Sequence, residues 1–549
     1  MNITMKTTPV LATALTSCVA ATQDVPKMKK AHIKAIFLSA ALSTVVLSAA
    51  HAQEPTPGYN HKIPAQIMTP DRVETRIGTL EFFDGMPNDA TVEKVYDNLL
   101  LNRGVETFLS GIPATSIEGL RLGMLELGAD ESNEVVVMGE LLDSTPLFLT
   151  GNTDTVYASG FLDLKKDGPT VVEVPAKSGP GTVNDAYFRF VTDMGIPGPD
   201  AGKGGKYLIL PPDYEGELDG PIGSKQTEID GETYYVSKSP SYVNWVIIRG
   251  FLVDGKPDAA REMFETGLKI YPLAKAKTQP KMKFINGSKQ VFNTIHANDY
   301  HFYEELNTVI QREPSSLLSP ELLGVFASAG IEKGKPFAPS QKQKQILTEA
   351  VAIGNATARA IVFKPRLEGV KYYADRGWMT AFVDGDYQWL KNGGKGGRNL
   401  DARTLFFYQA TVNTPAMAMK MVGKGSQYAY ITTDKDGNYL DGSKTYTLTI
   451  PANVPVKDFW SVVIYDPQTR SELQTGQPFP SKNNKRDELG VNPDGSVTLY
   501  FGPKAPEENK NNWIQTVANK GWYPILRLYG PLDPWFDKTW RPGEIESAK

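Results

Sequence analysis

Two runs of short β-type segments, separated by a long helical stretch, place the strongest limit on how this chain can fold. From about residue 134 to 254, and again from 426 to 540, segments rich in Val, Ile, Tyr and Phe alternate with Gly, Pro and Asp turns. This spacing predicts antiparallel sandwiches. A chain of 549 residues is also too long for a single core. The expected fold class is therefore mainly β with α, with two β-domains joined by a helical segment.

Shifts in the hydrophobic pattern set the expected domain boundaries. Thr69-Pro70-Asp71 is typical of a helix start, with the cap residue before a proline at the first helical position. We expect an N-terminal helical region over 60–130, a β-sandwich over 131–256, a helical region and connector over 257–403, and a jelly-roll-like β-domain over 404–542.

The N-terminal 52 residues have the pattern of an export signal. Met28 is followed by three lysines and then by an apolar run, 35–50, that is too short for a comfortable membrane span. Ala50-His51-Ala52 fits the small-x-small cleavage pattern. The pattern predicts a periplasmic or secreted protein without a transmembrane anchor, cleaved near Ala52. Residues 1–27 are then an upstream extension, 28–52 are the signal peptide, and both Met1 and Met28 stay open as the start.

Charge and cysteine content exclude several classes of protein. The chain carries a net charge of −4 and its first 52 residues contribute +4, so the remainder is acidic at −8. This balance gives no electrostatic argument for binding nucleic acid. The single cysteine, Cys18, precedes the cleavage site, which excludes disulfides, thiolate catalysis and Cys-ligated metals from the mature part. His296 and His301, five apart on an expected helix, do not form a same-face zinc pair. No cofactor is expected, and an oxygen-ligated Ca or Mg ion stays open.

A polar segment at an expected strand start, 151–160, holds the first candidate site residues. Asn152 and Asp154 would share one strand face, although strand interiors disfavour both residue types. In one interpretation they face a cleft, with Asp154 as the candidate catalytic acid or base, or cation ligand, and Asn152 as a ligand anchor. In the other they form an Asx-type turn that caps the strand. Tyr157 is a further ligand-binding candidate, although its face favours packing.

Two strands of the second β-region supply the remaining candidates. Tyr465 and Asp466 end the alternating run Phe459–Asp466 and are candidate ligand contacts. Arg527 lies in an apolar strand, where a buried charge without a partner costs several kcal/mol. Its expected partner is Asp154, Asp466 or an anionic ligand, with a structural ion pair favoured.

Aromatic clusters in the connector have two interpretations. Tyr372-Tyr373, Trp378 and Tyr387-Gln388-Trp389 could stack on sugar or aromatic ligands if they were exposed. Packing beneath a long loop is the favoured interpretation. The acidic run Asp434–Asn438 lacks calcium-loop spacing and predicts a hairpin turn.

Several short motifs, in a fixed order, resemble those of a paired family. The segment Asn152–Tyr157, followed by Leu162-Asp163-Leu164 and Val172–Pro175, resembles the domain of unknown function 1254. The partner, domain of unknown function 1214, is resembled by Leu440-Asp441-Gly442, Phe459-Trp460-Ser461, Tyr465-Asp466, Asp494-Gly495-Ser496 and Tyr529-Gly530-Pro531. The resemblance covers most of residues 60–542. It implies an immunoglobulin-like sandwich, a helical part and a jelly roll, and it implies no established activity, so no catalytic residue is carried over.

These observations leave three functions open. The first is an exported protein that binds a small polar or anionic ligand in an interdomain cleft, with a hydrolase or lyase activity left open. The second is a non-catalytic envelope or assembly protein, and the third is a Ca- or Mg-dependent enzyme. The expected partners are a small-molecule ligand and no nucleic acid, and a homo-oligomer stays open.

Overall fold

The first compact unit of the chain contains a small antiparallel sheet where the sequence predicted a helix. The computed structural model describes residues 63–216 and 226–548, so the extension, signal peptide and cleavage site lie outside the described residues. The chain divides into two units, 1–92 and 93–549. In the first, β1 (Arg72–Thr75), β2 (Gly78–Phe83) and β3 (Met86–Pro87) pair in that order. Asp84 and Gly85 turn the chain between β2 and β3 with φ of 47° and 82°. The dipeptide Asp-Gly favours this left-handed turn geometry. The hairpin therefore forms in place of the helix that the signal at Pro70 predicted.

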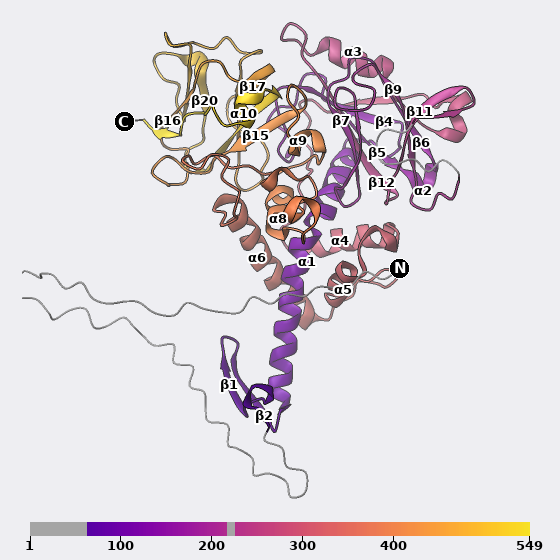
Figure 1. The fold of residues 1–549 in the computed structure, drawn as a ribbon, viewed down its shortest axis with the longest axis vertical. Helices are drawn as coiled ribbons and strands as arrows, with labels where there is room; N and C mark the ends of the chain where they lie inside the picture. Colours follow the sequence, from indigo (N-terminus) through magenta and orange to yellow (C-terminus); the bar gives the residue numbers. More distant parts are fainter. Residues whose placement is uncertain (1–62, 217–225, 549) are drawn as a thin grey trace, which may run out of the picture. The chain divides into compact units, whose positions relative to one another are not determined.

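Helices of the second unit pack around α1 (Asp89–Glu126), the long helix that continues into it (Figure 1). Glycines of α1 allow close approach, because an added Cβ at Gly104 would lie 2.6 Å from Ala350 of α6 (Gln341–Phe363). An added Cβ at Gly111 would lie 2.9 Å from Leu306 of α4 (His301–Arg312). The remaining helices are α2 (Leu164–Asp167), α3 (Asp258–Gly267), α5 (Pro320–Ser328), α7 (Lys391–Gly394), α8 (Leu400–Gln409), α9 (Pro415–Ala418) and α10 (Asp533–Phe536).

One helix among the described residues, α6, is long and apolar enough to cross a membrane by length and composition. Its residues Leu347, Ala350 and Val351 are buried in the protein. A buried core helix meets the same criteria, so α6 gives no clear transmembrane anchor.

The first β-region consists of two sheets that share a core. One has the order β10-β11-β9-β6-β13 and the other β14-β4-β5-β12-β7-β8. Val172 and Ile209 of the first sheet pack with Val156 and Val246 of the second. Most pairs are antiparallel as expected, but β11 with β9 and β14 with β4 are parallel. The strands are β4 (Glu134–Val137), β5 (Val156–Asp163), β6 (Thr170–Val174), β7 (Gly181–Asp185), β8 (Phe190–Met194), β9 (Gly205–Leu210), β10 (Gln226–Ile229), β11 (Glu232–Lys238), β12 (Val243–Gly250), β13 (Lys269–Pro272) and β14 (Lys283–Asn286).

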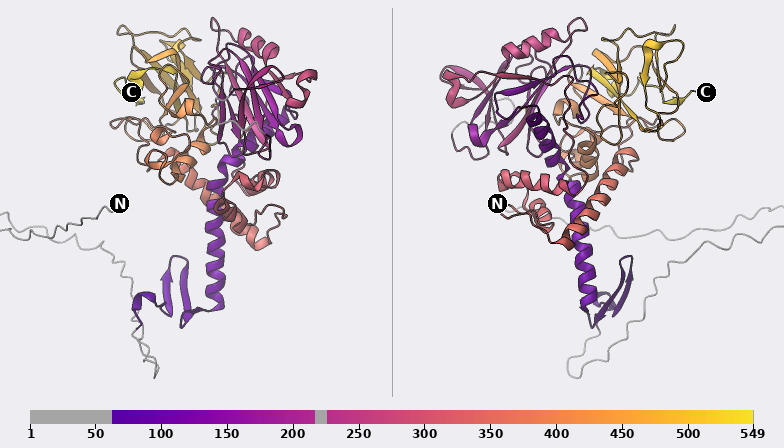
Figure 2. Two further views of the ribbon diagram at one scale, coloured as in Figure 1. Left: turned by 45° about the vertical axis from the view of Figure 1, so that its right-hand side comes forward. Right: turned by 180° about the vertical axis from the view of Figure 1, so that it is seen from behind.

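The second β-region also consists of two sheets, with the orders β15-β21-β17-β18 and β20-β19-β16-β22. Strand β17 separates two cores: Trp460, Val462 and Ile464 belong to the core between these sheets, whereas Val463 and Tyr465 belong to the central core of the molecule. The strands are β15 (Ser426–Tyr430), β16 (Tyr446–Ile450), β17 (Val456–Tyr465), β18 (Ser481–Asn483), β19 (Val497–Gly502), β20 (Trp513–Gln515), β21 (Tyr523–Pro531) and β22 (Glu546–Ser547). The two β-regions lie side by side in both views of Figure 2.

Most of the connector aromatics are packed inside the protein, as the favoured interpretation predicted, whereas Tyr372 and Tyr387 are half-buried. Tyr373, Trp378 and Trp389 are buried. Tyr372 stacks on Trp535 at a ring distance of 4.4 Å. The acidic run from Asp434 is a hairpin turn, in which the Asp434 carboxylate accepts the backbone N–H of Asn438 at 2.9 Å.

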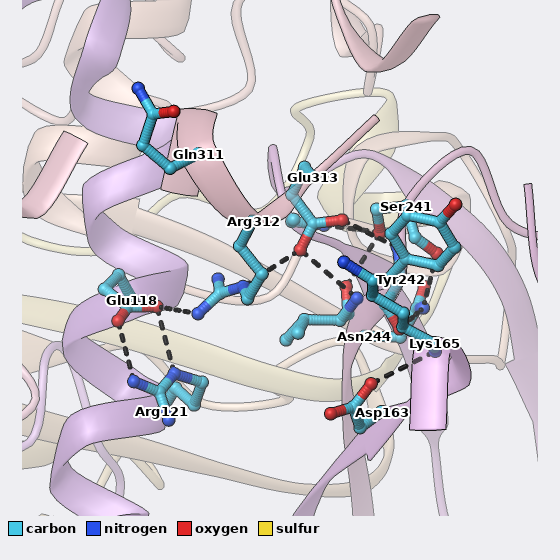
Figure 3. A network of polar contacts seen from close by, with 12 residues as sticks. Glu118, Arg121, Asp163, Lys165, Ser241, Tyr242, Asn244, Gln311, Arg312 and Glu313 are labelled. Atoms are coloured by element: carbon cyan, nitrogen blue, oxygen red, sulfur yellow. Dashed lines mark hydrogen bonds and ion pairs between the residues drawn. The ribbon is translucent and has the colours of Figure 1, made fainter. Parts of the chain in front are cut away.

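A buried network of ion pairs joins α1, the end of α4 and the start of β12 (Figure 3). Arg312 lies between two carboxylates, with Nη1 at 2.9 Å from Glu118 Oε2 and Nε at 3.1 Å from Glu313 Oε1. Glu118 also pairs with Arg121 at 2.8 Å, and Glu313 accepts the backbone N–H of Tyr242 at 2.6 Å. Burial raises the pKa of Glu118, but bonds to Arg121 and Arg312 outweigh it, so the net pKa is lowered.

Replacing Arg312 by methionine is expected to destabilise the protein by about 3 kcal/mol, because Glu313 loses its cation and Glu118 keeps only one. The measurement is the free energy of unfolding in denaturant. The matched control is Arg541→Met, since Arg541 pairs with Asp375 on the surface at 2.9 Å. An exposed pair contributes about 0 to 1 kcal/mol. Equal effects of the two variants would contradict a structural role for the buried network.

Candidate functional site

The segment before β5 is an Asx-type turn. Asn152 Oδ1 accepts the backbone N–H of Asp154 at 2.9 Å and of Thr155 at 3.2 Å. The strand begins only at Val156, so Asn152 and Asp154 lie outside it. The expectation that they share a strand face is therefore wrong. The capping interpretation of Asn152 is therefore confirmed. Its amide Nδ2 also donates to the hydroxyl of Tyr157, which fixes that ring against the turn.

The carboxylate of Asp154 ties the two β-regions together. Asp154 is fully buried, and Oδ2 accepts from the hydroxyls of Ser461 on β17 and Tyr529 on β21, the latter at 3.0 Å. Oδ1 accepts from Asn483 Nδ2 on β18 at 3.0 Å. Both oxygens thus accept hydrogen bonds from the second β-region, so Asp154 links the two β-regions.

Arg527 on β21 lies at the same junction but has no carboxylate partner among the described residues. Its Nη2 donates to the carbonyl oxygens of Thr150 and Gly151 at 3.0 and 3.1 Å and to the hydroxyl of Tyr465. Tyr465 in turn donates to Gly151 O at 2.7 Å. The prediction that Arg527 forms a structural ion pair with Asp154 or Asp466 is therefore wrong. Main-chain carbonyl groups and a phenol, rather than a carboxylate, contact its Nη2. Arg527 Nε is buried without a hydrogen-bond partner in the protein.

A second buried arginine, Arg249, faces the same place from β12 and was missed in the sequence. Its side chain donates from Nη1 to Ser426 Oγ at 3.5 Å and to Tyr428 OH at 3.3 Å, both long contacts. The guanidinium lies over the ring of Tyr157 at 5.8 Å. None of the described carboxylates forms an ion pair with it. An arginine that ends the apolar run 243–250 was the available signal, since the same argument singled out Arg527.

These side chains line a small cavity between the two β-regions, of about 40 Å³. Tyr157 and Arg249 come from the first β-region, whereas Tyr428 and Arg527 come from the second. Its apolar lining includes Phe148, Ile247, Phe406, Met417 and Ile525. A volume of this size holds a group of about three water-sized atoms. The cavity therefore combines two guanidinium groups with an apolar wall.

Neighbouring acids compensate the positive charge of this cavity only in part. Burial raises the pKa of Glu472 well above its ordinary value, which disfavours the charged form of this carboxyl group. Both Glu472 oxygens are buried without a hydrogen-bond partner in the protein. Burial also raises the pKa of Tyr428, but the charges of Arg249 and Arg527 outweigh it, and the net pKa is lowered. The field at the cavity thus favours anions.

A smaller neighbouring cavity, of about 20 Å³, shares Ile247, Arg249, Val412 and Met417 with the first. Asp193 lines it and accepts from Thr414 Oγ1 with both oxygens, at 2.7 and 2.8 Å. Burial raises the pKa of Asp193 to about 7. A carboxyl group in this range can hold or release a proton near neutral pH.

Asp466 lies apart from this arrangement. Its carboxylate pairs with Lys520 at 2.5 Å and lines a different pocket, of about 500 Å³, together with Arg359 and Trp522. The expected helix around His296 starts only at His301, and burial lowers the pKa of His296 to about 3. Among residues 63–216 and 226–548, His, Cys, Asp and Glu form no cluster of three or more that could hold a metal ion.

The comparisons with known proteins match both β-regions. A family model described as "Protein of unknown function (DUF1254)" matches residues 132–272, and one described as "Protein of unknown function (DUF1214)" matches residues 425–533. The chain is a paired DUF1254–DUF1214 protein. The cavity arginines come one from each domain: Arg249 belongs to DUF1254 and Arg527 to DUF1214.

One solved structure supports the fold of this DUF1254–DUF1214 protein and gives no activity. The crystal structure of the VPA0106 protein from Vibrio parahaemolyticus is 18% identical with a TM-score of 0.50, over 82% of this chain and 100% of that one. An uncharacterised protein from Burkholderia cenocepacia is 12% identical with a TM-score of 0.37, over 84% and 96%. The chain is mixed α and β, with strands in several sheets. None of the curated proteins compared with the chain matches it.

Proposed function

We propose that this protein binds a small monocarboxylate anion in the cavity between its DUF1254 and DUF1214 domains. The observation that carries the proposal is the pair of buried guanidinium groups, Arg249 and Arg527, which are 5% and 4% exposed and have no carboxylate partner among the described residues. A buried charge without a counter-charge costs several kcal/mol. A bound anion supplies that counter-charge.

The charge and size of the cavity limit which anions it can bind. Asp154 is a nearby acid whose carboxylate accepts hydrogen bonds from the second β-region, and it offsets one of the two arginines, whereas burial disfavours the charged form of Glu472. One positive charge then remains, which matches a monovalent anion. The planar guanidinium suits a carboxylate, which can accept two parallel hydrogen bonds. A head group of three heavy atoms fits the cavity of about 40 Å³, and Phe148 and Ile525 would contact its short apolar substituent.

Chemistry on the bound anion is the second candidate, as a hydrolase or lyase. It is favoured by two groups suited to proton transfer: Asp193, with its pKa of about 7, and Tyr428, whose pKa the two arginines lower. Export to the periplasm or the medium remains part of the proposal, supported by the signal pattern of residues 28–52. The immunoglobulin-like and jelly-roll assignments remain part of it too, supported by the paired sheets of each β-region.

The test is the binding of sodium acetate to the full chain by titration calorimetry, at constant ionic strength with chloride as the comparison anion. Acetate is expected to bind with a stoichiometry of one and to raise the unfolding temperature, since a ligand specific to the folded state stabilises it. Arg249→Met is expected to weaken acetate binding at least tenfold. Without acetate the variant should be at least as stable as the parent, because the substitution removes an uncompensated charge.

Arg541→Met is the matched control, since Arg541 lies on the surface in an ion pair with Asp375. It should leave acetate binding unchanged. Equal heats for acetate and chloride would overturn the proposal. So would an Arg249→Met variant that is less stable than the parent but binds acetate normally, because Arg249 would then be a structural residue.

A further inference from the structure

A larger pocket lies apart from the interdomain cavity, on the helical side of the protein. Its volume is about 490 Å³, within the usual range for small-molecule sites. Its walls come from α1, the turn between β7 and β8, α5, the connector and α8. Residues 186–189 form this turn, in which Asp185 Oδ1 accepts the backbone N–H groups of Tyr187 and Arg189, each at 2.8 Å.

Three arginines converge on this pocket: Arg189, Arg398 and Arg403. Arg189 is paired, with Nε at 2.6 Å from Asp185 Oδ2. Arg403 donates from Nη2 to Ser110 Oγ at 3.2 Å, and Arg398 donates to the carbonyl of Gln388. Neither Arg398 nor Arg403 forms an ion pair with a described carboxylate. Partial desolvation and the charge of Arg403 lower the pKa of Arg398, as expected for two guanidinium groups close to each other.

Polar atoms in the pocket wall lack partners within the protein. Arg403 is 7% exposed and its Nε has no hydrogen-bond partner. Trp389, 3% exposed, has a free indole Nε1, and the Oδ1 of Asn413, which is 2% exposed, is also without a donor. Buried polar groups are paired in nearly all proteins, so three unpaired polar atoms in the residues around one pocket are unusual.

Part of the wall is aromatic. Phe190 and Tyr387 meet edge to face at 5.7 Å, and Trp389 and Phe407 do so at 4.9 Å. All four side chains line the pocket. Aromatic walls of this kind bind flat apolar ring systems. Two acids, Glu106 and Glu321, also line the pocket; Glu106 accepts from Ser110 at 2.9 Å and Glu321 is exposed.

We propose that this pocket is a second binding site, for an aromatic carboxylate. The carboxylate binds to Arg403 and Arg398, and the ring lies against the aromatic wall formed by Tyr387, Trp389 and Phe407. Helix α8 separates the two sites: Phe406 lines the interdomain cavity, whereas Phe407 lines this pocket. The proposal does not depend on the monocarboxylate site.

The test is the binding of 2-naphthoate to the full chain, followed by its fluorescence and by calorimetry. The expected result is saturable binding with a stoichiometry of one at this pocket. Neutral 2-naphthamide has the same ring system and should bind at least tenfold more weakly. Arg398→Glu should weaken 2-naphthoate binding at least tenfold; because Arg398 is exposed, this variant should fold normally. Arg403→Met should have a similar effect.

Arg249→Met serves as the matched control from the other cavity and should leave 2-naphthoate binding unchanged. Conversely, Arg398→Glu should leave acetate binding unchanged, so the two proposals can fail separately. Equal affinities for 2-naphthoate and 2-naphthamide would overturn the proposal, as would unchanged binding in a folded Arg398→Glu variant. Absence of saturable 2-naphthoate binding at millimolar concentration would also overturn it.

Discussion

Replacing Asp154 by alanine is expected to destabilise the protein by about 4 kcal/mol or more, enough to unfold a chain of ordinary stability. The carboxylate accepts hydrogen bonds from Ser461, Asn483 and Tyr529, all in the fully buried junction. Alanine leaves these three donors unsatisfied, at about 1 to 3 kcal/mol each, and also leaves a cavity. Chemical denaturation with parallel fluorescence and circular dichroism measures the loss.

Asp154→Asn is the informative companion to the alanine variant. The hydroxyls of Ser461 and Tyr529 can rotate to accept from an amide, so we expect asparagine to cost about 1 to 2 kcal/mol. Removing the negative charge should also strengthen acetate binding at Arg249 and Arg527. An asparagine variant as unstable as the alanine variant would show that the charge of Asp154, rather than its hydrogen bonds, stabilises the junction.

Replacing Gly425 by alanine is expected to destabilise the protein by a similar amount and to weaken acetate binding. Gly425 has φ of 64° and comes directly before β15. An added Cβ would lie 2.2 Å from the carbonyl oxygen of Ala416, a backbone atom that cannot rotate away. The backbone of α9 would have to shift, and with it Met417, which lines both small cavities.

Gly437→Ala separates the two contributions to that effect. Gly437 has φ of 83°, but an added Cβ there would have no heavy atom within 4 Å. Only the left-handed backbone opposes alanine at this turn, so we expect a loss of about 1 kcal/mol. Thermal unfolding and acetate titration of both variants provide the comparison. Equal losses at the two positions would contradict the steric argument for Gly425.

The β-regions could be predicted from the sequence because their strands carry local signals. Runs such as 170–174 and 207–210 are β-branched or aromatic, and they form β6 and part of β9. The N-terminal hairpin was missed because Thr69-Pro70-Asp71 was interpreted as a helix start and the turn signal Asp84-Gly85 was not considered. Parallel pairs such as β9 with β11 have no local signature, since they depend on which distant strands meet.

The candidate site was predictable only in part. Arg527 does have partners, as expected for a buried arginine. They are carbonyl oxygens and the phenol of Tyr465, which no charge pattern in the sequence indicates. Arg249 also lies in an apolar strand, and this signal would have identified it as the second arginine of the cavity. The donors to Asp154 could not have been found, because Ser461 lies 307 residues further along the chain.

The hydrogen bonds of Asp154 between the two β-regions affect how a ligand enters and leaves the cavity. Swinging the two β-regions apart would break three buried hydrogen bonds at once, so that motion is too costly to serve as the route to the cavity. Entry must instead depend on local rearrangement of lining side chains such as Met417 and Phe406. Association gated in this way is slower than encounter by diffusion, and a bound anion would be released slowly for the same reason.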